Sequence, residues 1–239
     1  MTMHVEDLAY TVDGTEMIGH LAYDDTTSAR RPSVLLCHEG NGLSSHVKAR
    51  AERLAGLGYA AFALDYFGGG VQLPLDQARV KLGPLYDNPA ATARVGLAGL
   101  DMLLAQPVAD PARVAVIGYC FGGSMTLEIA RSGADVKAFV GFHPGLTVTP
   151  GSENIKGSVL MCFGTNDPFI SPEQRVAFEK EMTDAGVADW NLEVYGGVQH
   201  SFTNPQAADA GLPGLGYDAK ADARSWSSML RLFDETINA

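Results

Sequence analysis

The segment 118–123, with the sequence GYCFGG, carries the strongest chemical signal in the chain. It follows a short β-rich run and leads into a helical pattern, which is the strand–turn–helix setting of a G-x-nucleophile-x-G elbow. The flanking glycines have a physical reason, because larger side chains beside this strained turn would collide with the adjacent strand and helix. The free N–H groups at the start of the helix favour a thiolate at Cys120. We therefore predict that Cys120 is a nucleophile.

A cysteine nucleophile needs a base within hydrogen-bond reach, and the base needs a group that orients it. Asp167 lies on the loop after the predicted strand 159–163, and His200 lies on the loop after the predicted strand 191–195. The chain order nucleophile, acid, histidine matches proteins whose nucleophile sits at such an elbow. Either residue alone is a common loop residue. Their order and their shared position after strands predict the triad Cys120, His200 and Asp167.

Backbone N–H groups at two places are predicted to bind the oxyanion of the reaction. One is the N–H of Phe121, which follows the nucleophile, and the other is that of Gly40 in the loop 38–42 (HEGNG). Glu39 in the same loop has two open interpretations. A carboxylate beside an active thiol could hold a proton or hydrogen-bond the sulfur, or it could be a solvated loop acid.

Other histidines and cysteines also lie in or after predicted strands, but we assign them structural roles. His38 directly follows a buried strand. His143 follows the strand 136–140, where it could line a pocket, although packing is the preferred interpretation. Cys37 and Cys162 fall inside strands and are predicted to be inert small hydrophobic residues.

The elements that must position these residues alternate between strand and helix. Asp13-Gly14 favours a hairpin turn between the first two predicted strands. The segment 67–88 is predicted to be a loop, and its irregular sequence does not show which of its residues line the pocket. The pattern indicates a mainly parallel sheet with helices on both faces, whose ligands bind at the carboxyl ends of the strands. Strands are predicted at 5–12, 16–23, 33–37, 59–64, 113–117, 136–140, 159–163 and 191–195, and helices at 44–57, 89–106, 121–131, 172–185 and 219–236.

Composition limits the class of protein. The chain has 239 residues, is 46% apolar and carries a formal charge of −11, which opposes binding to nucleic acid and to anionic membranes. We expect one domain over residues 1–239, no secretory signal, no membrane span and a monomer. The three cysteines form an odd set without metal-ligand spacing, which favours a reducing cytoplasm over a disulfide framework.

These features together resemble the dienelactone hydrolase family. The resemblance implies an α/β-hydrolase fold without a large cap, and hydrolysis of esters or lactones through an acyl-cysteine intermediate with no cofactor or metal. It also implies that Glu39 contacts the resting thiol and helps to convert it to the thiolate. The resemblance rests on 37–39 (CHE), 118–123 (GYCFGG), 164–168 (GTNDP) and 200–202 (HSF), and it extends to 217–219 (YDA) and the last helix with Trp226.

One position departs from the family pattern. Members that act on dienelactone carry an arginine shortly after the catalytic histidine, and Asn204 stands in that segment here. An amide cannot supply a charged bidentate grip on a carboxylate, so a broader, neutral-ester specificity is expected. Arg79 is a candidate for a second family arginine. The expected pocket wall is aromatic and consists of Tyr66, Phe67, Phe121, Phe142, Phe169 and Phe202.

Three alternatives remain open from the sequence. The same site could serve a promiscuous esterase or thioesterase, or a hydrolase of activated phosphoesters. A different class of protein would use Cys120 as a thiol redox sensor, and a third possibility is a non-catalytic binding protein. A complete triad argues against the last of these.

Overall fold

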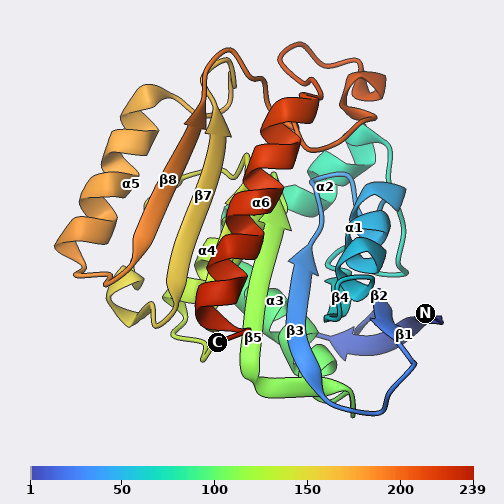
Figure 1. Cartoon of the computed structure of the whole chain (residues 1–239). Helices are drawn as coiled ribbons and strands as arrows, with labels where there is room; N and C mark the ends of the chain where they lie inside the picture. The colour runs from blue at the N-terminus through green and yellow to red at the C-terminus, as the bar shows by residue number, and fades with distance from the viewer. Residues whose placement is uncertain (1) are drawn as a thin grey trace.

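The computed structural model describes residues 2–239, which contain an eight-stranded sheet with the order β1-β2-β4-β3-β5-β6-β7-β8 (Figure 1). Strands β3 to β8 run parallel, whereas β1 and β2 form an antiparallel hairpin and β2 pairs antiparallel with β4. The predicted α/β class with a mainly parallel sheet is confirmed. The strands are β1 (Met3–Val12), β2 (Thr15–Asp24), β3 (Arg31–Cys37), β4 (Ala60–Leu64), β5 (Ala109–Tyr119), β6 (Ala138–Phe142), β7 (Ser158–Gly164) and β8 (Trp190–Tyr195).

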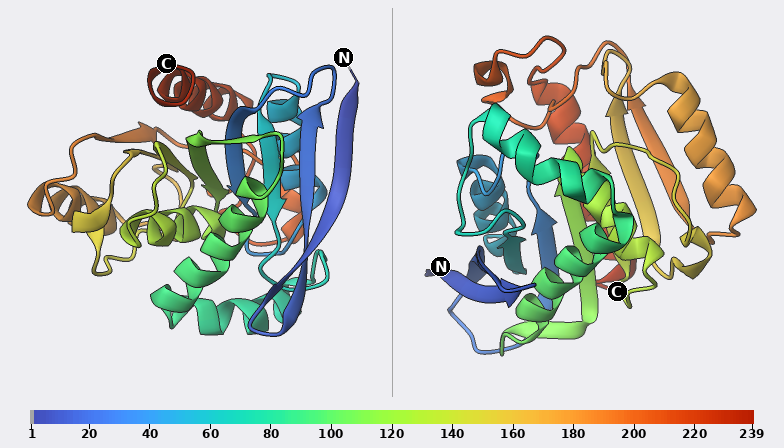
Figure 2. Two further views of the ribbon diagram at one scale, coloured as in Figure 1. Left: turned by 90° about the horizontal axis from the view of Figure 1, so that it is seen from below. Right: turned by 180° about the vertical axis from the view of Figure 1, so that it is seen from behind.

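Helices cover both faces of the sheet, so the protein has two apolar layers. Apolar residues of α1 and α6 pack on one face, and those of α2, α3, α4 and α5 pack on the other. Figure 1 shows α6 in front of the sheet, and the view from behind in Figure 2 shows α2 and α3 on the opposite side. The helices are α1 (Ser45–Ala55), α2 (Leu75–Tyr86), α3 (Pro89–Leu104), α4 (Phe121–Arg131), α5 (Pro172–Asp184) and α6 (Ala219–Thr236), with short 3₁₀ turns at Ser152–Asn154 and Ala207–Ala210.

Local sequence signals explain several of the boundaries. Asp13 and Gly14 both have positive φ, at 49° and 78°, which is the backbone that a tight hairpin turn between twisted strands requires. Helix α5 begins with a capping box in which Ser171 and Gln174 satisfy each other's backbone N–H groups. Helix α6 begins at the Asp218 side chain, which accepts the N–H groups of Lys220 and Ala221.

Helix α2 is the one helix that the sequence pattern did not predict. It lies inside the segment 67–88, contains Pro84, and buries only Ala78 among its residues. Its apolar face is narrow, with Ala78 buried and Leu82 and Leu85 partly buried, and Pro84 inside the helix weakens the periodic signal in the sequence. Two of its residues, Leu82 and Tyr86, lie beside the candidate site described below.

No helix within residues 2–239 is both long enough and apolar enough to cross a membrane.

Candidate active site

The candidate nucleophile occupies a strained turn between β5 and α4. Cys120 has φ 54° and ψ −120°, an uncommon backbone for a residue with a side chain. A Cβ atom at Gly118 would lie 2.0 Å from the Gly122 carbonyl oxygen, and one at Gly122 would lie 2.2 Å from the Cys37 carbonyl oxygen. Glycine is therefore required at both positions for the turn to close, as the motif predicted.

Asp167 and His200 meet at the carboxyl ends of β7 and β8. His200 Nδ1 lies 2.7 Å from Asp167 Oδ2, and both side chains are buried. The second carboxylate oxygen of Asp167 accepts the N–H of Phe169 at 2.9 Å, which fixes the plane of the carboxylate. The backbone of His200 is held in turn by the loop that precedes α6, through its N–H to the Gly214 carbonyl at 3.0 Å.

The electrostatic setting of His200 favours its protonated form. Burial acts against the imidazolium, but the negative charge of a nearby Cys120 thiolate and the hydrogen bond to Asp167 outweigh it and raise the pKa of His200 to about 10. The protonated form of His200 is the form that a neighbouring thiolate would stabilise.

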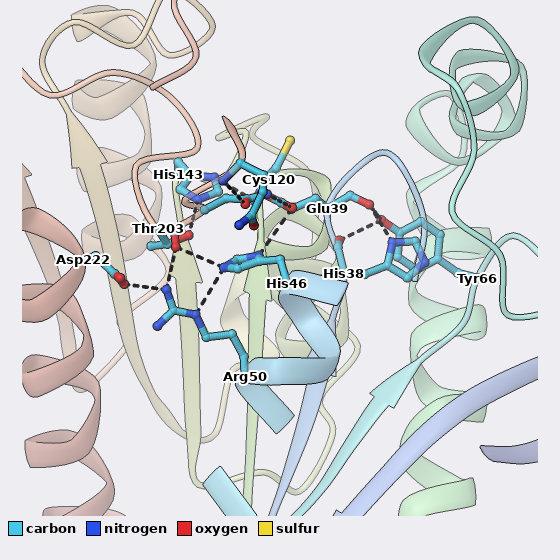
Figure 3. Close-up of polar contacts among 11 residues, drawn as sticks. His38, Glu39, His46, Arg50, Tyr66, Cys120, His143, Thr203 and Asp222 are labelled. Carbon is cyan, nitrogen blue, oxygen red and sulfur yellow. Dashed lines mark hydrogen bonds and ion pairs between the residues drawn. The ribbon is translucent and has the colours of Figure 1, made fainter. Parts of the chain in front are cut away.

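The resting position of the sulfur is less constrained than that of the histidine. Cys120 is partly exposed, and within residues 2–239 no hydrogen bond of normal length and angle joins its Sγ to the His200 ring. Figure 3 shows the sulfur directed away from the Glu39 carboxylate.

The two predicted oxyanion donors lie next to each other. A Cβ atom at Gly40 would lie 3.0 Å from a methyl group of Leu82 and 4.0 Å from Cβ of Phe121. The loop after β3 therefore passes beside the first residue of α4. The N–H of Phe121 is at the free N-terminal end of that helix, where backbone donors lack intrahelical partners.

Glu39 is buried and has different partners from those that the family resemblance implied. Its Oε2 accepts a hydrogen bond from Asn204 Nδ2 at 2.8 Å and lies 3.4 Å from His46 Nδ1 (Figure 3). No hydrogen bond joins Glu39 to Cys120 in the described part of the chain. Glu39 is therefore not a solvated loop acid, and Asn204 uses its amide on the protein rather than pointing it freely toward a substrate.

A chain of buried polar groups continues from Glu39 away from the site. His46 Nε2 lies 3.1 Å from the carbonyl oxygen of Thr203 and 3.2 Å from Arg50 Nε. Arg50 donates to the same carbonyl and to Asp222 at 2.8 Å. These contacts connect the loops after β3 and β8 with α1 and α6.

The predicted aromatic wall divides into two groups. Phe142 and Phe202 are 1% and 0% exposed and belong to the core, and their contact with substrate stays a prediction. Phe142 stacks on Tyr119 in the core at a ring separation of 4.9 Å, and Phe202 packs on Tyr195 at 5.5 Å. In contrast, Phe169 is 52% exposed and its ring lies 5.0 Å from that of His200.

Tyr66 and Phe67 are also buried, and Tyr66 packs against the loop that follows β3. The Tyr66 hydroxyl donates to the carbonyl oxygens of His38 and Glu39, at 2.8 Å and 3.0 Å. Its ring stacks on that of His38 at 3.5 Å, and burial lowers the pKa of this histidine to about 4. The structural role predicted for His38 is consistent with this stack, which fixes the loop that carries Glu39.

Helix α2 contributes a residue that the sequence did not reveal. The Tyr86 ring packs edge-on against Phe121 at 4.6 Å, although the residue as a whole is 57% exposed. Arg79 is exposed on the same helix and makes no hydrogen bond or ion pair with the candidate site residues within residues 2–239. Tyr86 and Leu82, not Arg79, are the α2 side chains beside the elbow.

His143 is closer to the nucleophile than its predicted packing role suggested. Its Nδ1 accepts the N–H of Cys120 at 3.1 Å, and its Nε2 lies 2.9 Å from Thr203 Oγ1. The position after β6 was the available signal, but the contact itself depends on the unusual backbone of Cys120. Within residues 2–239 there is no group of three or more His, Cys, Asp or Glu side chains arranged to hold a metal ion.

Comparison with known proteins shows the family of this chain. The model of the dienelactone hydrolase family matches residues 18–237, and the chain therefore belongs to the dienelactone hydrolase family, with its α/β-hydrolase fold. Its members act on lactones or esters, and several relatives are assigned by name to the carboxymethylenebutenolidases.

Individual relatives match over nearly their whole length. The dienelactone hydrolase-like promiscuous phosphotriesterase P91 from metagenomic libraries is 40% identical, with a TM-score of 0.94 over 98% of each chain. The protein m3DLH is 41% identical, with a TM-score of 0.94 over 98% of this chain and 99% of its own. Protein usf of Aquifex pyrophilus is 28% identical over 232 residues, 94% of this chain and 96% of the relative.

Proposed function

We propose that this protein hydrolyses carboxylic esters or lactones through an acyl-cysteine intermediate, with Cys120 as nucleophile, His200 as base and Asp167 as its orienting partner. The observation that carries the proposal is the convergence of three strand ends. Cys120 follows β5, and the buried Asp167–His200 pair, with its 2.7 Å hydrogen bond, follows β7 and β8. Membership of the family supports the hydrolase class independently.

In acylation, Cys120 Sγ attacks the carbonyl carbon, and the N–H groups of Phe121 and Gly40 stabilise the oxyanion. Collapse of the tetrahedral intermediate breaks the C–O bond, and the leaving alkoxide takes the proton from His200. This step needs a protonated histidine, and the raised pKa of His200 supports it.

In deacylation, the same histidine must be neutral, since it then accepts a proton from the attacking water. The charge of Cys120 is a main cause of the high His200 pKa, and that charge is lost when the sulfur becomes a thioester. The pKa of His200 therefore falls in the acyl-enzyme. Water attacks the thioester carbon, the C–S bond breaks, and the thiolate–imidazolium pair is restored.

Neutral esters and lactones are the substrates that the site favours. Asn204 carries no charge and its amide is committed to Glu39, and the exposed groups around the elbow include Phe169 and Tyr86. The Glu39 carboxylate near the site would repel an anionic substrate. Specificity for an anionic dienelactone is therefore expected to be weak.

Activated phosphoesters are a second candidate substrate class. The observation in favour is the likeness to P91, a promiscuous phosphotriesterase that is 40% identical to this chain. A thiolate at a strand–helix elbow can attack phosphorus as well as a carbonyl carbon. Hydrolysis of diethyl para-nitrophenyl phosphate, with Cys120→Ala alongside, tests this activity.

A thiol-sensor role is less well supported than hydrolysis. A sensor needs a second cysteine that can reach the first. Cys37 and Cys162 are both fully buried in strands, and burial raises the pKa of Cys37 to about 12. Neither is a suitable resolving thiol.

The deciding experiment compares hydrolysis of para-nitrophenyl acetate, para-nitrophenyl butyrate and a dienelactone by the wild type and Cys120→Ala. We expect turnover of the neutral esters, weak turnover of the dienelactone, and no turnover by the variant. Mass spectrometry of the wild type during turnover should find the acyl group on Cys120. Full activity of Cys120→Ala would exclude the proposed nucleophile.

We further propose that residues 1–239 form one domain that acts as a monomer in the cytoplasm on small molecules and not on nucleic acid. The charge of −11 and the free cysteines support this. Light scattering coupled to size exclusion should give the mass of one chain, 25.3 kDa.

A further inference from the structure

His143 is fully buried at the end of β6 and has a strained backbone of its own, with φ 44°. A histidine that only fills space does not need a left-handed backbone, which costs free energy in residues other than glycine. The backbone N–H of His143 donates to the Cys162 carbonyl at 2.8 Å, so this conformation is anchored in the sheet. The turn aims the imidazole at the nucleophile elbow.

The hydrogen bonds of His143 assign its protons. The Cys120 backbone N–H donates to the Phe142 carbonyl at 2.9 Å and also meets His143 Nδ1 at 3.1 Å; because this N–H can only donate, that Nδ1 atom carries no proton. Burial, followed by the charge of His200, lowers the pKa of His143 well below its usual value, so the ring is neutral. Its single proton is therefore on Nε2, which donates to Thr203 Oγ1 at 2.9 Å.

The same ring also touches the base. The imidazoles of His143 and His200 lie 4.9 Å apart, nearly edge to face, and the Phe169 ring meets His200 at 5.0 Å. Because His143 is neutral, it adds no charge repulsion when His200 becomes an imidazolium. One side chain thus contacts the backbone of the nucleophile and the ring of the base.

Thr203 is the fixed point at the other end of this contact. It is buried, and its carbonyl oxygen accepts from Arg50, which an ion pair with Asp222 holds at 2.8 Å. The same carbonyl lies 3.1 Å from His46 Nε2. Thr203 is three residues from His200 on the same loop, so its position and that of the base are linked.

We propose that His143 and Thr203 are positioning residues, which hold the nucleophile elbow and the loop of the base in register through the hydrogen bond between Nε2 and Oγ1. This inference rests on the proposed function, because it assumes that Cys120 and His200 react together. Its claim is additional, since neither residue touches the substrate. The bond acts by keeping Cys120 and His200 at a reactive separation.

The test compares Thr203→Val with Thr203→Ser. Valine keeps the shape of threonine but leaves the Nε2 proton of His143 without an acceptor, whereas serine keeps the hydroxyl. We expect kcat on para-nitrophenyl acetate to fall about 10- to 100-fold in Thr203→Val with little change in KM, since misplacement of reacting groups by about 1 Å has effects of that order. Thr203→Ser should stay within about threefold of the wild type.

A second variant breaks the same bond from the other side. In His143→Asn, the amide oxygen can still accept the Cys120 N–H and asparagine tolerates the left-handed backbone, but the donor to Thr203 is lost. If both variants remove one interaction, the double variant His143→Asn/Thr203→Val should be no slower than the slower single variant. Multiplicative losses would overturn the proposed bond.

The readout that separates positioning from stability is the pH dependence of Cys120 alkylation by iodoacetamide. In Thr203→Val the nucleophile elbow and the loop that carries His200 should shift relative to each other, so this profile should shift. In Thr203→Ser the profile should stay unchanged. Both variants are measured at a temperature where circular dichroism shows that they are folded. An unshifted profile with unchanged kcat in both bond-breaking variants would refute the inference. Retained activity of Cys120→Ala would instead refute the proposed function, so the two failures are distinguishable.

Discussion

Replacing Asp167 by asparagine tests the role of the acid most directly, because the structure predicts the outcome for either orientation of the amide. The carboxylate accepts from His200 on one oxygen, at 2.7 Å, and from the Phe169 N–H on the other, at 2.9 Å. Asparagine has one oxygen. If it accepts from Phe169, its NH₂ group faces His200 Nδ1, and the ring must carry its proton on Nε2. If it accepts from His200, its NH₂ group faces the N–H of Phe169, and two donors then oppose each other.

The wrong tautomer removes the base, since Nε2 must accept a proton from water. A change of this kind in an acid–histidine pair costs up to about 10⁴-fold in kcat, and we expect about 10²- to 10⁴-fold, or about 3 to 5 kcal/mol in activation free energy. Deacylation should suffer more than acylation, because a cysteine is intrinsically a strong nucleophile. Asp167→Asn should therefore accumulate acyl-enzyme.

Stopped-flow release of para-nitrophenolate measures both steps. Asp167→Asn should give a burst close to one equivalent followed by a slow steady state, with acetylated Cys120 visible by mass spectrometry. Asp135→Asn is the matched control, because it removes a carboxylate that is 76% exposed and pairs only with Lys137. A steady-state rate for Asp167→Asn within about threefold of the wild type would refute the assigned role.

Three further outcomes are expected. Arg50→Met should lower the free energy of unfolding by about 3 to 5 kcal/mol in urea titrations, since it leaves Asp222 buried without its ion pair; a loss below about 1 kcal/mol would contradict this. Cys120→Ala should lower the pKa of His200 from about 10, because the charge of the thiolate is removed. NMR titration of the imidazole should then show that the histidine loses its proton at a lower pH than in the wild type. Gly118→Ala should abolish activity and lower the melting temperature, since its methyl group would meet a carbonyl oxygen 2.0 Å away; a fully active, stable variant would show that the elbow can relax.

The elements that the sequence predicted correctly are those that a local pattern determines. Helix α4 begins at Phe121 as predicted, because the elbow needs a helix to start directly after the nucleophile. The hairpin turn at Asp13-Gly14 and the helix bounds of α6 at Ala219–Thr236 also follow from local signals, a turn dipeptide and a strong amphipathic pattern. These features could be predicted without knowledge of the remaining chain.

Other features depend on contacts between distant residues, and the sequence did not reveal them. Asn204 and Glu39 are 165 positions apart, and nothing local indicates that the amide binds that carboxylate. Aromatic type alone did not tell the exposed Phe169 from the buried Phe202, since both follow strands close to the site. Helix α2 has a narrow apolar face and contains Pro84, so the sequence did not predict a helix there and its Tyr86 could not be placed at the elbow.

The four non-glycine residues with positive φ within residues 2–239 have an implication for how this protein tolerates mutation. Three of them, Cys120, His143 and Ser201, lie in the turns that carry or adjoin the candidate triad. Such backbones cost on the order of 1 to 3 kcal/mol each, against about 5 to 15 kcal/mol for the net stability of a typical domain. Because the net stability already includes this cost, packing elsewhere in the chain must offset it. Variants selected for new substrates should therefore depend on compensating changes in the two apolar layers, far from the pocket itself.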